Sequence, residues 1–128
     1  MRKALFIYNS KSGKNQLQKP AGIMNHLRTK GIETTAFYLA GTDAEARLND
    51  ALNREDFDLA VASGGDGTIN FTINALVKAG RQIPVGIIPA GTCNDLARNL
   101  KIPLNQKKAL DLITTGETTT IDIGLIND

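Results

Sequence analysis

The chain alternates between short apolar runs and segments whose apolar residues recur at helical spacing, and this alternation constrains the fold more than any other feature. The apolar runs occupy residues 4–8, 34–39, 58–63 and 84–88. Nearly continuous apolar runs of this length are typical of strands in a parallel sheet that is covered on both faces. The order of the segments therefore predicts an α/β fold with Rossmann-like architecture, in which a parallel sheet lies between two layers of helices.

The segments between the runs predict helices, several of which end at a glycine. These helices cover residues 17–30, 42–54 and 69–79, and are followed by a short helix that ends before Pro103 and by a helix over residues 105–113. Thr42 and Glu45 have the spacing of a capping box, so Thr42 is expected to cap the second helix. The apolar faces of the first three helices are predicted to consist of Ile23, Met24, Leu27, Ala46, Leu48, Leu52, Ile69, Ile73, Leu76 and Val77.

Residues 118–128 alternate polar and apolar side chains as a strand does, and no closing element follows them. A strand at this position fits the edge of a domain, and it also fits the first part of a longer protein. We favour the second interpretation.

Composition excludes several classes of protein. The 128 residues carry 41% hydrophobic side chains and a net charge of +2, which is typical of one globular domain and lacks the dense basic patch of a nucleic-acid-binding protein. The single cysteine, Cys93, rules out an internal disulfide, and the apolar run near the N-terminus is too short for a signal peptide. We therefore expect a cytoplasmic protein whose contact with any membrane is peripheral.

The sequence GGDGT, residues 64–68, follows the third predicted strand directly. It is not a P-loop, and Asn70 occupies the position of the third glycine in the dinucleotide-binding fingerprint. Gly64, Gly65 and Gly67 nevertheless allow the backbone to approach a ligand closely. The free N–H groups at the start of the following helix would face a phosphate group, so the segment has the parts of an anion site.

Asp66 is the residue that such a site has to explain. A carboxylate repels a bare phosphate, but it attracts a phosphate-bound Mg²⁺, directly or through water. Asp66 therefore indicates a metal-bound phosphate ester such as MgATP. Asp-Gly is also a common hairpin turn, although the buried strand before it and the helical pattern after it argue against a hairpin here.

Two further polar loops follow strands, and in a parallel sheet all three loops open on the same edge. NSKSGKN, residues 9–15, is also compatible with an ordinary solvated loop. In PAGTCND, residues 89–95, Thr92 offers a hydroxyl, and Asn94 or Asp95 would serve equally well as a helix cap. His26 and Cys93 have no catalytic partners in the sequence and are expected to be a surface residue and a loop residue.

Taken together, the three loops resemble the diacylglycerol kinase catalytic family, whose pattern is roughly NPxSG, GGDGTxNEV and PxGTxNDFAR. The corresponding segments here are NSKSG, GGDGTINFT and PAGTCNDLAR, in the same order and over essentially the whole chain. GGDGT alone is shared with NAD kinases, which remain the alternative enzyme. PAGTCNDLAR favours the lipid kinases.

The resemblance implies a set of site residues and cofactors. The implied ATP site consists of Asn9, Ser10, Lys11, Ser12, Gly13, Gly64, Gly65, Asp66, Gly67, Thr68, Ile69, Asn70 and Thr92. Asp66 and Asp95 are implied to be catalytic through Mg²⁺, which they would hold directly or through water. Thr42 is the nearest candidate for a further nucleotide contact, but its spacing fits poorly.

The resemblance also implies what residues 1–128 lack. Family members continue into a β-rich second domain that closes the cleft and supplies the general base for the acceptor hydroxyl. Residues 1–128 are accordingly expected to be the ATP-binding N-terminal domain of a lipid kinase of phospholipid metabolism, inactive in isolation. The acceptor would be a membrane lipid such as diacylglycerol, and no nucleic acid partner is expected. The sequence leaves open whether the protein forms a homodimer.

Three positions depart from the family pattern, where Ser10 replaces proline, Leu96 replaces phenylalanine and Phe71 replaces glutamate. The last change removes a carboxylate beside the site. It supports a third hypothesis, a degenerate relative that binds nucleotide as a regulatory module.

Overall fold

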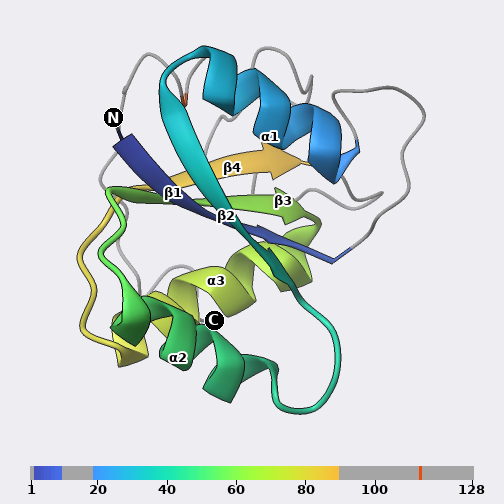
Figure 1. The fold of residues 1–128 in the computed structure, drawn as a ribbon. Helices are drawn as coiled ribbons and strands as arrows, with labels where there is room; N and C mark the ends of the chain where they lie inside the picture. Colours follow the sequence, from blue (N-terminus) through green and yellow to red (C-terminus); the bar gives the residue numbers. More distant parts are fainter. Residues whose placement is uncertain (1, 10–18, 90–112, 114–128) are drawn as a thin grey trace.

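A computed structural model of the protein describes residues 2–9, 19–89 and 113. Its four strands form a parallel sheet in the order β2-β1-β3-β4 (Figure 1). The strands are β1 (Arg2–Tyr8), β2 (Ile32–Tyr38), β3 (Leu59–Gly64) and β4 (Val85–Pro89). The predicted parallel sheet is therefore confirmed, with strand ends that differ from the expected ones by one or two residues.

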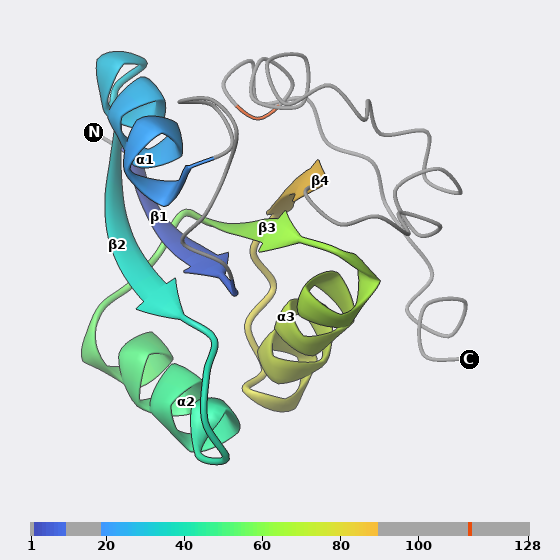
Figure 2. The same ribbon diagram turned by 90° about the vertical axis from the view of Figure 1, so that its right-hand side faces the viewer.

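Among the described residues, three complete helices cover the two faces of this sheet. They are α1 (Pro20–Thr29), α2 (Ala44–Arg54) and α3 (Asp66–Lys78). Figure 2 shows α1 on one side of the sheet and both α2 and α3 on the other. This arrangement confirms the predicted three-layer α/β architecture.

Strand β1 separates the two halves of the core because its successive side chains point to opposite faces. Ala4 and Phe6 belong to the α1-face cluster, whose other members are Ile23, Leu27, Ile32, Leu59, Val61, Ile88 and Ile113. Leu5 and Ile7 belong to the α2/α3-face cluster, together with Phe37, Leu48, Leu52, Phe57, Ala60, Ala75 and Leu76. Residues 4 to 7 have no solvent-exposed surface, which agrees with the near-continuous apolar run.

Several details of the predicted helices are wrong. Helix α1 begins at Pro20 and not at residue 17, because proline suits the first helical position, where its missing N–H would have no partner in any case. Gly31 ends this helix as expected, with φ of 83°. On α3, Val77 is 51% exposed although its spacing predicted burial, and on α2 the exposed Ala46 is likewise outside the core.

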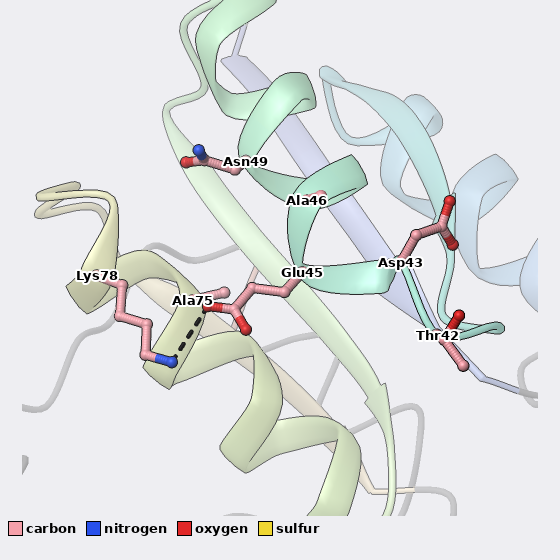
Figure 3. Close-up of a pocket in the computed structure, with 7 residues that line it drawn as sticks. All are labelled: Thr42, Asp43, Glu45, Ala46, Asn49, Ala75 and Lys78. Atoms are coloured by element: carbon pink, nitrogen blue, oxygen red, sulfur yellow. Dashed lines mark hydrogen bonds and ion pairs between the residues drawn. The ribbon is translucent and has the colours of Figure 1, made fainter.

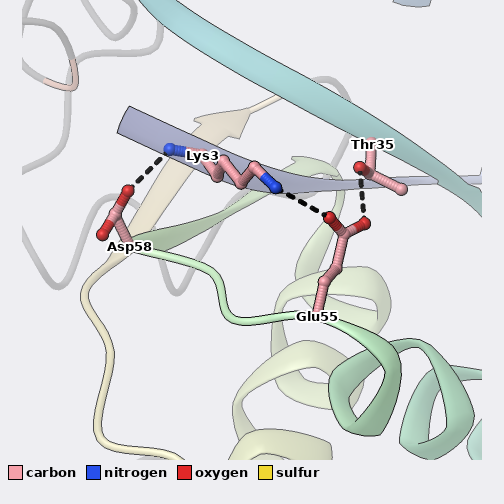
Figure 4. A network of polar contacts seen from close by, with 4 residues as sticks. All are labelled: Lys3, Thr35, Glu55 and Asp58. Atoms are coloured by element: carbon pink, nitrogen blue, oxygen red, sulfur yellow. Dashed lines mark hydrogen bonds and ion pairs between the residues drawn. The ribbon is translucent and has the colours of Figure 1, made fainter. Parts of the chain in front are cut away.

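At the amino ends of the strands, a polar network joins β1 to its neighbours (Figure 4). The backbone N–H of Lys3 donates to the Asp58 carboxylate at 2.7 Å, and the Asp58 N–H donates to the Lys3 carbonyl at 2.8 Å. The Glu55 carboxylate accepts from Lys3 Nζ at 3.3 Å and from Thr35 Oγ1 at 3.1 Å. These contacts join β1 to β2 and to the segment that leads into β3.

The remaining predicted elements, namely the helices after residue 89 and the strand at residues 118–128, lie outside the described residues apart from the buried Ile113. Within the described part of the chain, none of the helices is long and apolar enough to cross a bilayer.

Gly86 on β4 makes room for Ile113. A Cβ atom on Gly86 would lie 2.6 Å from Ile113 Cγ1 and 2.8 Å from Cδ1, which is closer than carbon atoms approach. The absence of a side chain at residue 86 therefore lets Ile113 reach the α1-face cluster.

We predict that Gly86→Ala lowers the free energy of unfolding by about 1–3 kcal/mol, because the added methyl group overpacks this contact. Urea unfolding measures the loss. In an Ile113→Ala background the methyl group occupies vacated space, so the same substitution should cost little. An equal loss in both backgrounds would contradict the contact.

Candidate functional site

The carboxyl ends of the four strands lie level with one another. Tyr8 pairs with Tyr38 of β2 and with Ser63 of β3, and Gly64 pairs with Pro89 of β4. The three polar loops predicted as a joint site therefore start from the same edge of the sheet. The chain leaves β1 toward β2 on one side and returns to β3 on the other, so the topological switch point lies between β1 and β3, where ligands of such sheets bind.

Two of the predicted loops meet at this switch point. A Cβ atom on Gly64 would lie 3.1 Å from Asn9 Oδ1, 2.7 Å from Thr68 Oγ1 and 2.9 Å from Thr68 Cβ. Only glycine fits at residue 64, because any side chain would occupy the space between these two polar groups. Asn9 of the first loop and Thr68 of GGDGT are thus brought together around Gly64.

Helix α3 begins at Asp66, inside GGDGT, and not at residue 69 as predicted. Its N-cap residue is Gly65, which has no side chain to pair with the N–H groups of the first turn. The half-buried Asp66 lies in that first turn, where the partial positive charge of the helix end stabilises a carboxylate. The helix end therefore presents N–H donors and one acidic side chain at the switch point.

Two buried side-chain oxygens in this first part of α3 lack hydrogen-bond partners among the described residues. They are Thr68 Oγ1 and Asn70 Oδ1. Thr68 is only 2% exposed. The nearby Thr72, also buried, donates to the Thr68 carbonyl at 2.8 Å, so its hydroxyl is satisfied. A buried polar group without a partner costs about 1–3 kcal/mol, and a ligand that supplies partners recovers this free energy.

The predicted capping box at the start of α2 does not form. The N-cap residue is Asp43, and its side chain makes no capping hydrogen bond. Glu45 instead forms an ion pair with Lys78 of α3 at 3.1 Å, so its carboxylate is turned away from the helix start. Thr42 and Glu45 lie with five other residues around an open hollow of about 480 Å³ between α2 and α3 (Figure 3).

Phe71 and His26 also have defined surroundings. Phe71 is half-buried and packs against the α2/α3-face cluster, so the phenyl ring at the position where the pattern has glutamate has a packing role.

His26 was predicted to be a surface residue but is half-buried, and its Nε2 is buried without a partner in the described part of the chain.

Other predicted site residues have no described geometry. Ser10, Lys11, Ser12, Gly13, Thr92 and Asp95 lie outside the described residues, as does Cys93, which was expected to be a loop residue. Of the two predicted Mg²⁺ ligands, only Asp66 is therefore placed. Within residues 2–9, 19–89 and 113, no group of three or more histidine, cysteine, aspartate or glutamate side chains is arranged to hold a metal ion.

Comparison with known protein families shows which family this chain belongs to. The family described as the diacylglycerol kinase catalytic domain matches residues 3–126 of the chain. The chain belongs to this family. A diacylglycerol kinase from Bacillus subtilis strain 168 is 41% identical over 131 residues, which span 99% of this chain and 43% of the relative. A diacylglycerol kinase from Staphylococcus aureus strain MRSA252 is 37% identical over 130 residues, 99% of this chain and 41% of the relative.

Solved structures agree with this membership. A crystal structure of a diacylglycerol kinase from Bacillus anthracis strain Sterne has a TM-score of 0.70 and 26% identity, over 91% of this chain and 44% of that one. A second crystal structure from the same strain reaches a TM-score of 0.72 with 29% identity, over 91% of this chain and 40% of that one. The chain thus spans about two fifths of the length of these diacylglycerol kinases.

Gly64 and Gly67 of GGDGT give a matched pair of variants. Gly64→Ala should lower the free energy of unfolding by about 1–3 kcal/mol, because its methyl group collides with Thr68 and Asn9. At Gly67 a Cβ atom would meet nothing within 4 Å. Gly67→Ala should therefore leave stability unchanged or raise it by up to about 1 kcal/mol. Thermal unfolding of both variants tests this order, and a reversed order would contradict the packing around Gly64.

Proposed function

We propose that the chain is the ATP-binding part of a lipid kinase that transfers the γ-phosphoryl group of MgATP to a lipid hydroxyl. Membership of the diacylglycerol kinase catalytic family supports the kinase activity. The observation that carries the nucleotide site is the pair of buried oxygens of Thr68 and Asn70, which have no partner among the described residues and lie beside a helix start whose N-cap is Gly65. Together with Asn9, these groups surround the switch point of the sheet.

The described residues fit a phosphate group. Backbone N–H donors at a helix start favour negative charge, and the gap maintained by Gly64 lets the Asn9 amide and the Thr68 hydroxyl reach the same space. In this proposal Gly64, Gly65 and Gly67 supply backbone contacts, and Thr68 and Asn70 supply side-chain contacts. Ser10, Lys11, Ser12, Gly13 and Thr92 extend the site from the neighbouring loops.

Asp66 and Asp95 would hold Mg²⁺ in this arrangement, directly or through water. The bound ion would neutralise the charge that develops on the transferred phosphoryl group. Asp66 is suitably placed for this role because it lies in the same turn of α3 as the N–H groups proposed for the phosphates. A carboxylate there offsets part of the anion attraction of the helix end unless a cation accompanies the ligand.

The lipid acceptor and the general base belong to the wider proposal. We infer that a β-rich second domain closes the cleft and accepts the proton of the lipid hydroxyl, so that residues 1–128 alone bind nucleotide without turnover. The proposed acceptor is a membrane lipid such as diacylglycerol, reached by peripheral contact. Diacylglycerol is the substrate named by the relatives, which are about two and a half times as long.

A second candidate function is a nucleotide-binding regulatory module without kinase activity. The half-buried Phe71 supports it, since the family has a glutamate at this position and here the ring contributes to packing. Phe71→Glu would restore the carboxylate but place its charge against the α2/α3-face cluster. Phe71→Gln is therefore the better variant for testing whether a polar side chain at this position changes activity. Activity in the unmodified full-length protein would eliminate the regulatory module.

Titration of the protein with ATP tests the metal assignment. We expect binding to require Mg²⁺ and to weaken at least tenfold in Asp66→Asn, which keeps the size of the side chain but removes its charge. Isothermal titration calorimetry measures both, with Glu55→Gln at the opposite edge of the sheet as the matched control. Equal binding by Asp66→Asn and the unmodified protein would contradict the metal role.

Thr68→Val separates ligand binding from folding. Valine has nearly the shape of threonine but no hydroxyl. Removing a buried oxygen that has no partner within residues 2–9, 19–89 and 113 should leave the free protein equally stable or stabilise it by up to about 1–2 kcal/mol. The affinity for MgATP should nevertheless fall about five- to tenfold. Thermal unfolding with and without MgATP measures both effects. A clear loss of stability in the free protein would show that the hydroxyl has a structural partner instead.

A further inference from the structure

Arg47 of α2 reaches back to residues 39–43, which connect β2 to α2. Its guanidinium donates to the Tyr38 carbonyl at 3.4 Å and to the Ala40 carbonyl, while its Nε donates to the Asp43 carboxylate at 3.1 Å. The same guanidinium lies over the Phe37 ring, 5.0 Å from the ring centre. One side chain thus contacts the end of β2, the connection itself and the start of α2.

This connection lies at the edge of the sheet that carries the proposed nucleotide site. The Leu39 N–H donates to the Tyr8 carbonyl at 2.7 Å, and the residue after Tyr8 is Asn9. Because the strand order is β2-β1-β3, residues 39–43 flank Asn9 on the side opposite Gly64. Neighbouring strands are about 4.8 Å apart, so β2 and β3, from which the connection and GGDGT leave, are roughly 10 Å apart. A ligand that extends from α3 across Asn9 would reach residues 39–43.

The chemistry of arginine suits a residue that contacts several groups of the connection at once. The planar guanidinium has five donors in a fixed arrangement, so it can serve two carbonyls and a carboxylate at once. Lysine would retain the charge, but its single ammonium group cannot reproduce this geometry. The side chain is 39% exposed, and the Asp43 carboxylate that it pairs with is 66% exposed, so the ion pair alone is a weak contribution. The carbonyl contacts and the packing on Phe37 are what hold the connection.

We propose that Arg47 is a positioning residue for nucleotide binding, which holds residues 39–43 as the wall of the ATP site on the β2 side. This inference rests on the proposed function. Arg47 touches no reacting atom in this proposal. It acts by keeping the connection in the conformation that the ligand meets, so that little ordering is needed when the ligand binds.

Arg47→Met in the full-length protein tests the proposal. Without the guanidinium contacts the connection samples other conformations, and apparent affinity falls by the fraction of time spent in the competent one. We expect KM and Kd for MgATP to rise about tenfold, with kcat changed less than about twofold. In the ligand-free protein, amide hydrogen exchange of residues 39–43 should accelerate.

Three companion variants sharpen the test. Arg47→Lys should fall between the unmodified protein and Arg47→Met, because it retains only the charge. Asp43→Asn should change KM less than about twofold, since it removes only an exposed ion pair. Lys78→Met, which breaks an exposed α2–α3 ion pair away from the connection, should leave KM for MgATP unchanged.

The outcomes separate this inference from the proposed function. If the unmodified protein fails to bind MgATP, the proposed function is wrong and the role of Arg47 is overturned with it. If the unmodified protein binds MgATP but Arg47→Met shows the same KM and Kd despite faster exchange, Arg47 is a structural residue only and the inference fails. If Arg47→Met does not fold, an unchanged KM in Arg47→Lys overturns the inference equally.

Discussion

The parallel pairing of β1 with a strand on each side is the interaction on which the rest of the molecule depends. β1 is in register with β2 from its first residue and with β3 from Ala4, so the three strands end level with one another. This register alone brings Asn9, the connection after Tyr38 and the GGDGT segment to one edge. Because residues 4–7 of β1 are fully buried between two layers of helices, a shift of the register by one residue would move each of these side chains from one core cluster to the other.

The site at this edge contains buried polar groups that have no hydrogen-bond partners among the described residues. Thr68 lies in α3 with its hydroxyl buried and unpartnered within the described residues, although an apolar residue of the same shape would pack equally well. Such a group destabilises the folded protein, but it can form a hydrogen bond with a bound ligand. The position of such groups beside a helix start with a glycine N-cap is therefore a stronger sign of a ligand than the glycines alone, which also occur in ordinary turns.

The sequence predicted the features that depend on short-range patterns and missed those that depend on distant partners. The first four strands, the two-sided cover and the shared edge follow from apolar runs and their order, and these were confirmed. The strand predicted at residues 118–128 lies outside the described residues. The capping box at Thr42 was wrong because Lys78, on another helix, pairs with Glu45. Three glycines in GGDGT lower helix propensity, so the start of α3 was placed too late.

The contacts around the site show the same limit. The meeting of Asn9 with Gly64 depends on register, which the sequence implied only as a shared edge. The contacts of Arg47 could not be predicted from the sequence. Two of its partners are backbone carbonyls, and because every residue has one, no residue type identifies them. Predictions for Ser10, Lys11, Ser12, Gly13, Thr92 and Asp95 stay predictions, because these residues lie outside the described part of the chain.

The place of Ile113 in the core has a consequence for the order in which the protein forms during synthesis. The α2/α3-face cluster is composed of residues 5 to 76, with partly buried neighbours up to Val85, so all of its members are synthesised before Ile113. The α1-face cluster is completed only when Ile113 arrives beside Ala4 and Phe6. The two faces of one sheet would thus close at different times, α2 and α3 first, with the α1 side of β4 left open until residue 113 emerges.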